Sequence, residues 1–289
     1  MTTKPSPTVR RRRLGLELRR LRELAGMTCE EVGRHQDCSG PRISRIETGH
    51  IGIRPGEVRE LLDLYDVSDE SARDALVSIA RDARKKGWWR TYSDVLPAWF
   101  EARVGLEAET TTLKVYETQF VPGLLQVREY ARAILAAGQP LASDEEIDRQ
   151  VELRLDRQRL LTGEDPPQLW VVLSEAVLRI PVGGAAVLRA QLDHLVKVDD
   201  LPHVTIQVLP FDSSAHAMAM GAFSILAFPE PADPDVVYFE YHTGSAYLES
   251  QEEVQRYRLA FEHLQVEALG AAQSVEMIRQ AARDLRDPR

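Results

Sequence analysis

A chain of 289 residues, 44% of them hydrophobic, is long enough for two globular domains with a core each. It contains no apolar run long enough to cross a bilayer, and its N-terminus lacks the apolar segment of a secretory signal. Two cysteines do not make a disulfide framework. We therefore expect a cytoplasmic protein with no membrane partner.

The net charge of −9 argues against a nucleic-acid partner only while the chain is taken as a whole. Residues 1–86 hold 18 Lys and Arg against 14 Asp and Glu, a net charge of +4, which leaves −13 for the remainder. A basic end joined to an acidic body is typical of a DNA-binding domain attached to a second domain. The acidic part taken alone is more simply explained as a solvated surface.

The N-terminal segment is predicted to be a disordered arm followed by a helix. Residues 1–9 contain two prolines and have little apolar surface to bury. Residues 10–13 form a basic run, which we interpret as contacting DNA phosphates rather than as a merely solvated terminus. A helix is expected over about 14–25, because apolar residues recur there at helical spacing.

The stretch from Met27 to Gly49 carries the clearest local signals. Thr28 and Glu31 have the spacing of a capping box, which begins a short helix. After a polar break, Ser39 is expected to cap a second helix, and Pro41 fits the first turn of that helix, where no backbone N–H is needed.

The second of these helices has an apolar and a polar side. Ile43 and Ile46 are three residues apart and therefore share a buried face. Polar and basic residues occupy the other faces, at Ser39, Gly40, Arg42 and Arg45. Two short helices joined by a tight turn, with basic residues on the second, predict a helix-turn-helix that places its second helix in the major groove of DNA.

This stretch resembles the phage-repressor type of helix-turn-helix, also called the XRE family, in LRRLRELAGMT (Leu18 to Thr28), EEV and ISRIETG (Ile43 to Gly49). In that family an Arg of the first helix pairs with the Glu that ends the recognition helix. The resemblance therefore implies an ion pair between Arg22 and Glu47. Cys29 stands where the family usually has a phosphate-contacting Gln, a departure that concerns this one contact and not the fold.

Two further helices are predicted after the helix-turn-helix. One is expected over about 56–65, and another begins at Ser68 or Asp69 and is closed by the positive charges of Lys85 and Lys86. We therefore expect a mainly α, five-helix repressor-type domain over residues 10–84.

Residues 85–110 are predicted to be an aromatic-rich connecting segment. Trp88-Trp89 begins it, and Trp99-Phe100 follows in a short helix expected over about 93–104. Adjacent tryptophans on a helix cannot both point into one pocket, so we favour a hydrophobic joint between the domains. An aromatic-lined ligand pocket is the alternative.

Residues 111–285 are predicted to form an α+β domain around a small sheet. Short β-branched or aromatic runs predict strands at about 111–119, 168–173, 204–209, 223–228 and 236–240. Helices are expected over about 124–137, 143–161, 184–196 and 251–285, the last broken near Gly270. The third helix lies between two of the strands and makes a β-α-β unit. The second is expected to show a mostly exposed, salt-laced face with Arg149, Arg154, Arg157 and Arg159.

The C-terminal part also resembles a known domain. The matching residues are FVPGLLQ (Phe120 to Gln126) with EYARA, LSEAVLR and VGG (Leu173 to Gly184), QLDHL, VTIQVLPF, YFEYHTGSAYLE and RYRLAFEHL. They resemble the domain shared by a large group of actinobacterial repressor-type regulators. These regulators are described as antitoxin-like, and their genes often lie beside a gene for a small partner protein. The resemblance covers about residues 88–285 and implies a regulator with a small protein partner.

Catalytic motifs are absent from the sequence. There is no Gly-x-Ser-x-Gly, His-Glu-x-x-His, phosphate-binding Gly-rich loop or Cys-x-x-Cys, and Gly183-Gly184 and Gly244-Ser245 are interpreted as loop glycines. We therefore expect no enzyme, no cofactor and no metal. The one conceivable metal or acid–base site would need its strands to pair, and would combine His203, His216, Glu175 and Glu240.

The two cysteines suggest one further hypothesis. Cys29 lies at a helix N-terminus, which lowers a thiol pKa, and Cys38 lies just before the recognition helix. A redox switch on DNA binding is conceivable, although two small, partly buried residues are the simpler interpretation.

The sequence thus predicts a sequence-specific regulator that binds double-stranded DNA. Candidate base contacts are Ser39, Gly40, Arg42, Ser44 and, chief among them, Arg45, because Arg donates in a forked manner to guanine. Candidate phosphate contacts are Arg10, Arg11, Arg12, Arg13 and Thr28. The resemblance to the XRE family adds Thr48, Gly49 and His50, because the segment after the paired Glu contacts phosphates in that family. A homodimer is expected, because one short helix reads too few bases.

Two other interpretations remain for the C-terminal domain. It could bind a small molecule that changes DNA affinity, or the protein could act mainly as an antitoxin-like module that binds a small protein and only represses its own operon.

Overall fold

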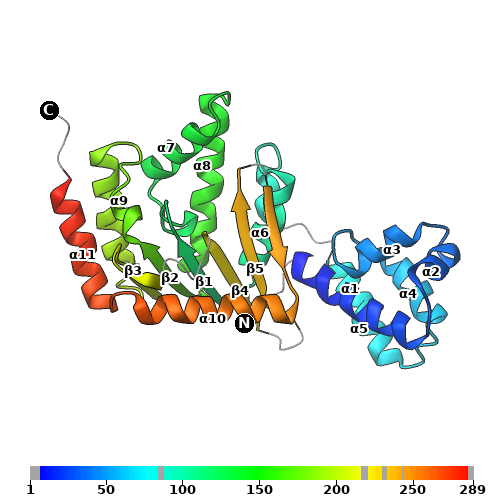
Figure 1. Ribbon diagram of the computed structural model, residues 1–289. Coiled ribbons are helices and arrows are strands. Elements are labelled where there is room, and N and C mark those ends of the chain that lie inside the picture. Colours follow the sequence, from blue (N-terminus) through cyan, green and yellow to red (C-terminus); the bar gives the residue numbers. More distant parts are fainter. Residues whose placement is uncertain (1–6, 84–87, 216–220, 230–232, 243, 286–289) are drawn as a thin grey trace. The chain divides into compact units, whose positions relative to one another are not determined.

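The computed structural model describes residues 7–83, 88–215, 221–229, 233–242 and 244–285 (Figure 1). The chain divides into two compact units, residues 1–90 and 91–289, each of which we describe by itself. The division falls inside the segment 85–110 that the sequence marks as a connection. No helix among the described residues combines the length and apolar character needed to span a bilayer.

The first unit is helical, as predicted. Its helices are α1 (Pro7–Leu24), α2 (Cys29–His35), α3 (Gly40–Glu47), α4 (Pro55–Leu64) and α5 (Glu70–Asp82). The disordered arm was predicted over residues 1–9, which is too long, because α1 already begins at Pro7. Proline suits the first turn of a helix, and the Arg- and Leu-rich residues after it are good helix formers. Residues 1–6 of the arm lie outside the described part of the chain.

One hydrophobic core joins the five helices of the first unit. Leu18 of α1, Val32 of α2 and Ile43 of α3 are at most 2% exposed, and they pack with Leu62 of α4 and Val77 of α5. Ile46, the second apolar residue predicted on the recognition helix, belongs to the same core. Burial of this stripe leaves the opposite side of α3 facing outward.

Two glycines let the helices approach closely. A Cβ added to Gly15 of α1 would lie 2.4 Å from the carbonyl oxygen of Glu47 and 2.6 Å from that of Ile46. A Cβ on Gly33 of α2 would lie 2.7 Å from the carbonyl oxygen of Cys38. Both clashes are with backbone, which cannot move aside cheaply. These glycines therefore set how near α1 and α2 come to the recognition helix and its turn.

The second unit is an α+β domain, as predicted. Its strands are β1 (Thr112–Glu117), β2 (Gln168–Ser174), β3 (Val204–Leu209), β4 (Phe223–Ala227), β5 (Val236–Tyr241) and β6 (Gly244–Leu248). Its α-helices are α6 (Ala98–Glu107), α7 (Arg128–Gly138), α8 (Asp144–Gln158), α9 (Ala185–Val198), α10 (Gln251–Glu267) and α11 (Ala271–Asp284). Short 3₁₀ helices are η1 (Trp88–Tyr92), which spans the division between the units, η2 (Gly123–Leu125), η3 (Arg159–Leu161) and η4 (Glu175–Leu178).

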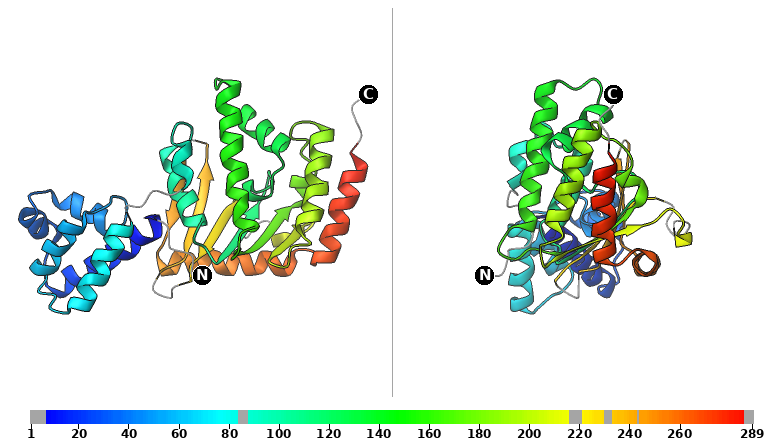
Figure 2. Two further views of the ribbon diagram at one scale, coloured as in Figure 1. Left: turned by 180° about the vertical axis from the view of Figure 1, so that it is seen from behind. Right: turned by 90° about the vertical axis from the view of Figure 1, so that its left-hand side faces the viewer.

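The strands form one mixed sheet in the order β3-β2-β1-β4-β5-β6. β1 pairs in parallel with β2, and β2 with β3, while β4, β5 and β6 continue the sheet in antiparallel pairs. The predicted β-α-β unit is β2-α9-β3. Figures 1 and 2 show α10 along one side of the sheet and α7, α8 and α9 on the other. β1 thus lies centrally, with the parallel and antiparallel halves on either side of it.

Three local predictions for this unit were wrong. Gly244-Ser245 begins β6 rather than lying in a loop, because the hairpin from β5 pairs Tyr241 with Gly244. The helix expected over 93–104 lies later, as α6, since Pro97 precedes its first turn. The helix expected over 124–137 is divided into η2 and α7.

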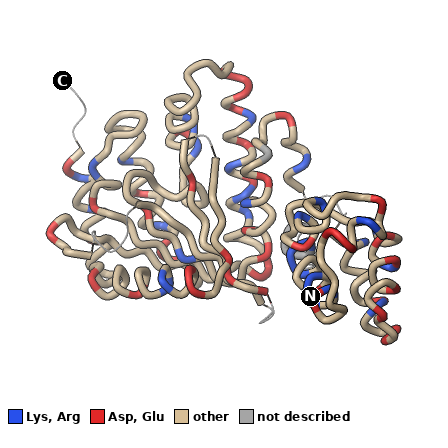
Figure 3. Tube along the Cα trace, turned by 45° about the vertical axis from the view of Figure 1, so that its right-hand side comes forward, with Lys and Arg blue, Asp and Glu red and all other residues tan. Residues whose placement is uncertain are grey.

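One arginine of the predicted exposed face on α8 was placed incorrectly. Arg and acidic residues alternate along this helix (Figure 3), but Arg157 is buried. Its guanidinium donates to Glu107 of α6 at 2.9 and 3.0 Å, and Arg103 of α6 lies 3.0 Å from the same carboxylate. Although burial alone would raise the pKa of Glu107, the two guanidinium groups lower it. These three residues tie α6 to α8 beneath the surface.

We predict that Gly15→Ala destabilises the first unit by about 1–3 kcal/mol, although alanine favours helices, because its Cβ would collide with the end of α3. Gly56→Ala is the matched control. Apart from its chain neighbours and the backbone of α4, no described atom lies within 4 Å of a Cβ at Gly56, so this change should stabilise by about 0.4–1 kcal/mol. Hydrogen exchange of the α1 and α3 amides in the full chain measures the stability change caused by each substitution. Equal protection in the two variants would contradict the close approach.

Candidate nucleic-acid interface

The helix-turn-helix begins with the capping box that the sequence predicts. The backbone N–H of Glu31 donates to the Thr28 hydroxyl at 3.2 Å, and the N–H of Thr28 donates to the Glu31 carboxylate at 2.7 Å. The Thr28 hydroxyl itself donates to that carboxylate at 2.8 Å. To donate to a phosphate, the hydroxyl would have to give up its bond to Glu31. The donor of Thr28 is therefore already used within the capping box.

The turn between α2 and α3 is held by the backbone. Asp37 has φ +47, a left-handed conformation that Asp tolerates better than most residues. The N–H of Cys38 then donates to the carbonyl oxygen of Gly33 at 2.8 Å. The turn is therefore tight, and it leads directly into the recognition helix α3.

α3 begins at its predicted N-cap but without a side-chain cap. Ser39 has extended backbone angles, and its hydroxyl makes no capping hydrogen bond to the described residues. Pro41 has no N–H to offer at the second helical position, and the N–H of Arg42 donates to the backbone carbonyl of Ser39 instead, at 2.9 Å. The exposed Ser39 hydroxyl is left available for a ligand at the front of the helix.

The candidate base contacts do not share one environment. Ser39, Ser44 and Arg45 are exposed, whereas Gly40 is buried. A Cβ on Gly40 would lie 2.9 Å from the Glu30 carboxylate of α2. Gly40 therefore serves the packing of α2 against α3, and a base contact at this position stays a prediction.

Arg42 is half-buried and already has a partner. Its guanidinium donates to Glu57 of α4 at 2.8 Å, and Glu57 also accepts the N–H of Arg54 at 2.8 Å. Burial alone would raise the pKa of Glu57, but the Arg54 N–H and the Arg42 guanidinium lower it. No local sequence pattern indicates this pair, because the partners lie 15 positions apart on different helices.

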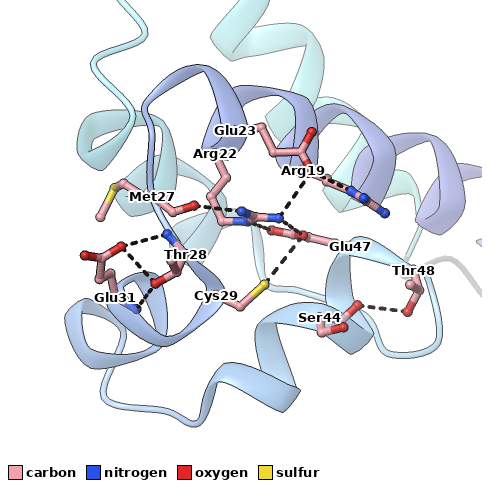
Figure 4. A network of polar contacts seen from close by, with 10 residues as sticks. All are labelled: Arg19, Arg22, Glu23, Met27, Thr28, Cys29, Glu31, Ser44, Glu47 and Thr48. Carbon is pink, nitrogen blue, oxygen red and sulfur yellow. Dashed lines mark hydrogen bonds and ion pairs between the residues drawn. The ribbon is translucent and has the colours of Figure 1, made fainter.

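The ion pair that the XRE resemblance implies is present (Figure 4). Arg22 of α1 donates to both carboxylate oxygens of Glu47 at 2.7 and 2.9 Å, and its third nitrogen donates to the carbonyl oxygen of Met27 at 2.7 Å. The two side chains are 11% and 5% exposed. Hydrogen bonding to Glu47 raises the pKa of Arg22 although burial opposes it. This pair links α1, the start of α2 and the end of α3.

Two further residues border this ion pair. The thiol of Cys29 lies 3.9 Å from a Glu47 oxygen, and the buried Tyr65 hydroxyl has no hydrogen-bond partner among the described residues. Burial, followed by the negative charge of Glu47, raises the pKa of both groups. The lowered thiol pKa expected at the α2 N-terminus was therefore wrong for Cys29. Cys29 and Cys38 are both free thiols of intermediate exposure.

The basic run of residues 10–13, which lies within α1, is only partly at the surface. Arg13 is exposed and Arg11 is half-buried, but Arg12 is 6% exposed. A Cβ on Gly49 would lie 2.9 Å from Cγ of Arg12, so Arg12 packs against the loop after α3. Arg12 is therefore largely covered in the unbound chain, and a phosphate contact by it stays a prediction. The side chain of Arg10 lies outside the described residues.

The segment after α3 has a defined shape. The Thr48 hydroxyl donates to the Ser44 carbonyl oxygen at 2.9 Å, and a ring nitrogen of His50 lies 2.8 Å from the same hydroxyl. Gly49 has φ +73, which a residue with a side chain adopts only with strain. Thr48 and His50 remain exposed, so phosphate contacts by them stay predictions.

The metal or acid–base site considered in the second unit is not assembled. Glu175 follows β2 and Glu240 lies on β5, and two strands, β1 and β4, separate β2 from β5 in the sheet. The ring of His203 instead contacts the carbonyl oxygen of Leu161 at 3.0 Å, and His216 lies outside the described residues. Among the residues that the structure describes, no three or more His, Cys, Asp or Glu gather as metal ligands.

The aromatic segment packs as pairs. The Trp88 and Trp89 rings meet edge to face at 6.0 Å, and those of Trp99 and Phe100 at 5.5 Å. Phe100 also lies under the buried guanidinium of Arg157, 4.8 Å from ring centre to carbon. Phe100 is therefore part of the packing between α6 and α8.

The first unit thus belongs to the class of helix-turn-helix proteins, the fold of DNA-binding regulators. A family model described as a helix-turn-helix domain matches residues 13–76. A second model, described as a domain of unknown function (DUF5753), matches residues 100–280, which is more than half of the chain. The chain belongs to this DUF5753 family. No curated protein and no solved structure gave a match.

We predict that Glu47→Gln lowers the free energy of unfolding of the first unit by about 3 kcal/mol, because it leaves the Arg22 guanidinium buried without its counter-charge. Glu17→Gln is the matched control. The Arg20–Glu17 pair of α1 has side chains that are 56% and 35% exposed, so its loss should not change stability measurably. Urea unfolding and hydrogen exchange of α1 and α3 measure the difference. Similar effects of the two changes would show that the buried pair is not needed to fix α3.

Proposed function

We propose that this protein is a sequence-specific DNA-binding transcriptional regulator of the XRE type. The supporting observation is the two-sided character of α3. Ile43 and Ile46 are buried in the core, while Ser44 and Arg45 of the same eight-residue helix and its N-cap residue Ser39 are exposed. A helix held this way can enter the major groove with its exposed residues against base edges.

We further propose that the protein binds as a homodimer. One recognition helix of eight residues reads too few bases for specific binding, and repressor-type domains pair on half-sites one DNA turn apart. Phosphate contacts would come from Arg11, Arg13 and the exposed Thr48 and His50 that flank α3. Each such contact releases counterions, so binding should weaken as salt rises.

For the second unit we propose a non-catalytic role in regulation through a small protein partner encoded nearby. The support is its separate compact body, its net charge of −13 outside residues 1–86, and the antitoxin-like resemblance of its motifs. Acidic domains select basic partners through long-range electrostatics. The alternatives are a small-molecule-responsive repressor and an antitoxin-like module that only represses its own operon.

The decisive experiment maps the chromosomal sites that the protein occupies, with and without the neighbouring gene. A regulator modulated by its neighbour should keep the same sites and change its occupancy. Occupancy restricted to its own promoter would favour the autoregulating module. The proposal fails if the purified protein retains no genomic fragment even at low salt.

We predict that Arg45→Ala costs about 1–3 kcal/mol of specific binding, because it removes a forked donor to guanine, while weak non-specific binding persists. Arg81→Ala changes an exposed arginine of α5 and is the matched control. Both are measured as dissociation constants for an operator fragment and for unrelated DNA at the same salt concentration. Normal operator binding by Arg45→Ala would remove this residue from the interface.

A further inference from the structure

Arg42 lies in the middle of a row of polar side chains at the front of the recognition helix. It is the third residue of α3, three positions after the N-cap Ser39 and three before Arg45, so these side chains follow one another along one side of the helix. The N-terminal residues of a recognition helix are the ones that reach base edges in the major groove. Arg42 is therefore placed where a side chain can read sequence, and it already holds a partner there.

Glu57 holds Arg42 from the first turn of α4. One oxygen of its carboxylate accepts a hydrogen bond from the guanidinium at 2.8 Å, and the other oxygen accepts the backbone N–H of Arg54, also at 2.8 Å. Arg54 is the N-cap of α4, and a Glu three residues later commonly bonds to the N-cap N–H in this way. The backbone of α4 thus fixes the carboxylate, and the carboxylate fixes a side chain of α3.

The pair is only half-covered, so it can still meet a ligand. The side chains of Arg42 and Glu57 are 32% and 25% exposed. The bond to Glu57 uses one nitrogen of the guanidinium, and an arginine has further N–H donors in the same plane. Hydrogen bonding to Glu57, and then to the Cys38 thiol, raises the pKa of Arg42. Arg42 is therefore a charged donor whose direction is set before DNA arrives.

The negative charge of Glu57 affects which part of DNA this arginine can bind. A phosphate is bound through positive charge and the release of counterions, and the Arg42–Glu57 pair has no net charge. A base edge is read through the direction of hydrogen bonds, and a guanidinium can donate in a forked manner to O6 and N7 of guanine. A side chain that is already held also loses less conformational entropy on binding. The pair therefore weakens a phosphate contact and favours a guanine contact.

We propose that Glu57 is a specificity-determining positioning residue, which holds Arg42 so that its remaining donors read one guanine in the major groove and keeps this arginine away from the phosphates. Glu57 touches no base itself and acts through Arg42. The inference rests on the proposed function, because it concerns the same DNA-reading face of α3.

The experiment selects double-stranded DNA from a pool of random sequences with the full chain and with each variant, and sequences the fragments that are retained. The unmodified chain should enrich a sequence with one guanine per half-site whose preference Arg42→Ala weakens by about tenfold. Glu57→Gln should weaken the same preference by about three- to tenfold, because Arg42 must then be immobilised on binding. Glu60→Gln removes the same charge from an exposed position of α4 and should leave the preference unchanged.

The salt dependence of binding gives a second readout. Dissociation constants for unrelated DNA are measured over a range of salt concentrations. Glu57→Gln should bind unrelated DNA more tightly than the unmodified chain, with a salt slope that is steeper by about one, because Arg42 is then free to contact a phosphate. A steeper slope with an unchanged guanine preference would show that Glu57 only repels phosphates, and would refute its positioning role.

Two further variants separate positioning from a structural role. When Arg42→Ala is already present, Glu57→Gln should change the base preference no further, and an additional change would show that Glu57 does not act through Arg42. Gln at position 57 can still accept the Arg54 N–H, so α4 stays capped and the melting temperature should change little. Arg42→Lys keeps the positive charge beside Glu57 but lacks the fork, and should lose the guanine preference. A retained preference in Arg42→Lys would contradict the guanine contact.

The outcome for the unmodified chain distinguishes failure of this inference from failure of the proposed function. If the unmodified chain enriches no sequence, the proposed DNA-reading function fails and the inference falls with it. If the unmodified chain enriches a sequence, and Glu57→Gln enriches the same sequence with the same guanine preference, the function stands and the inference alone is overturned.

Discussion

The buried ion pair between Arg22 and Glu47 determines how the recognition helix is held. Burying two charges stabilises a fold only when each is fully paired, and here the guanidinium uses three donors on Glu47 and the Met27 carbonyl. The apolar contacts of α3 alone would allow it to roll about its axis, since Ile43 and Ile46 would stay buried over a range of angles. The ion pair at its last residue, with the backbone contact at Gly15, removes that freedom. The outward face of α3 is thereby fixed.

The outward face of α3 carries two arginines whose side chains differ in conformational freedom. Arg42 is tethered to Glu57, whose own position is set by the Arg54 N–H at the start of α4. Arg45 is exposed, so it keeps its conformational freedom until it meets a ligand. A tethered guanidinium loses less entropy on binding and presents its remaining donors in a fixed direction, while a free one adapts at a higher entropic cost. The helix therefore combines a preorganised donor with an adaptable one.

Local signals in the sequence predicted much of this arrangement, and contacts between distant residues account for the rest. The Thr28–Glu31 capping box and the Ile43–Ile46 spacing depend on neighbours within one turn, and both are present. The burial of Gly40, the tether of Arg42 and the packing of Arg12 depend on how three helices meet, which no periodicity encodes. In the second unit five strands were predicted, but β6 (Gly244–Leu248) and the order of the strands were not. The exposed-face prediction failed for Arg157 because its partner, Glu107, lies 50 positions earlier.

Both units use arginine to neutralise a buried carboxylate, and in each the pairing joins two helices. In the first unit Arg22 of α1 pairs with Glu47 at the end of α3. In the second, Glu107 of α6 is shared by Arg103 of the same helix and Arg157 of α8. A buried charge costs stability unless its partners stay in place, so each pairing holds its helices in one arrangement. Buried charges therefore fix α3 relative to α1 in the first unit and α6 relative to α8 in the second.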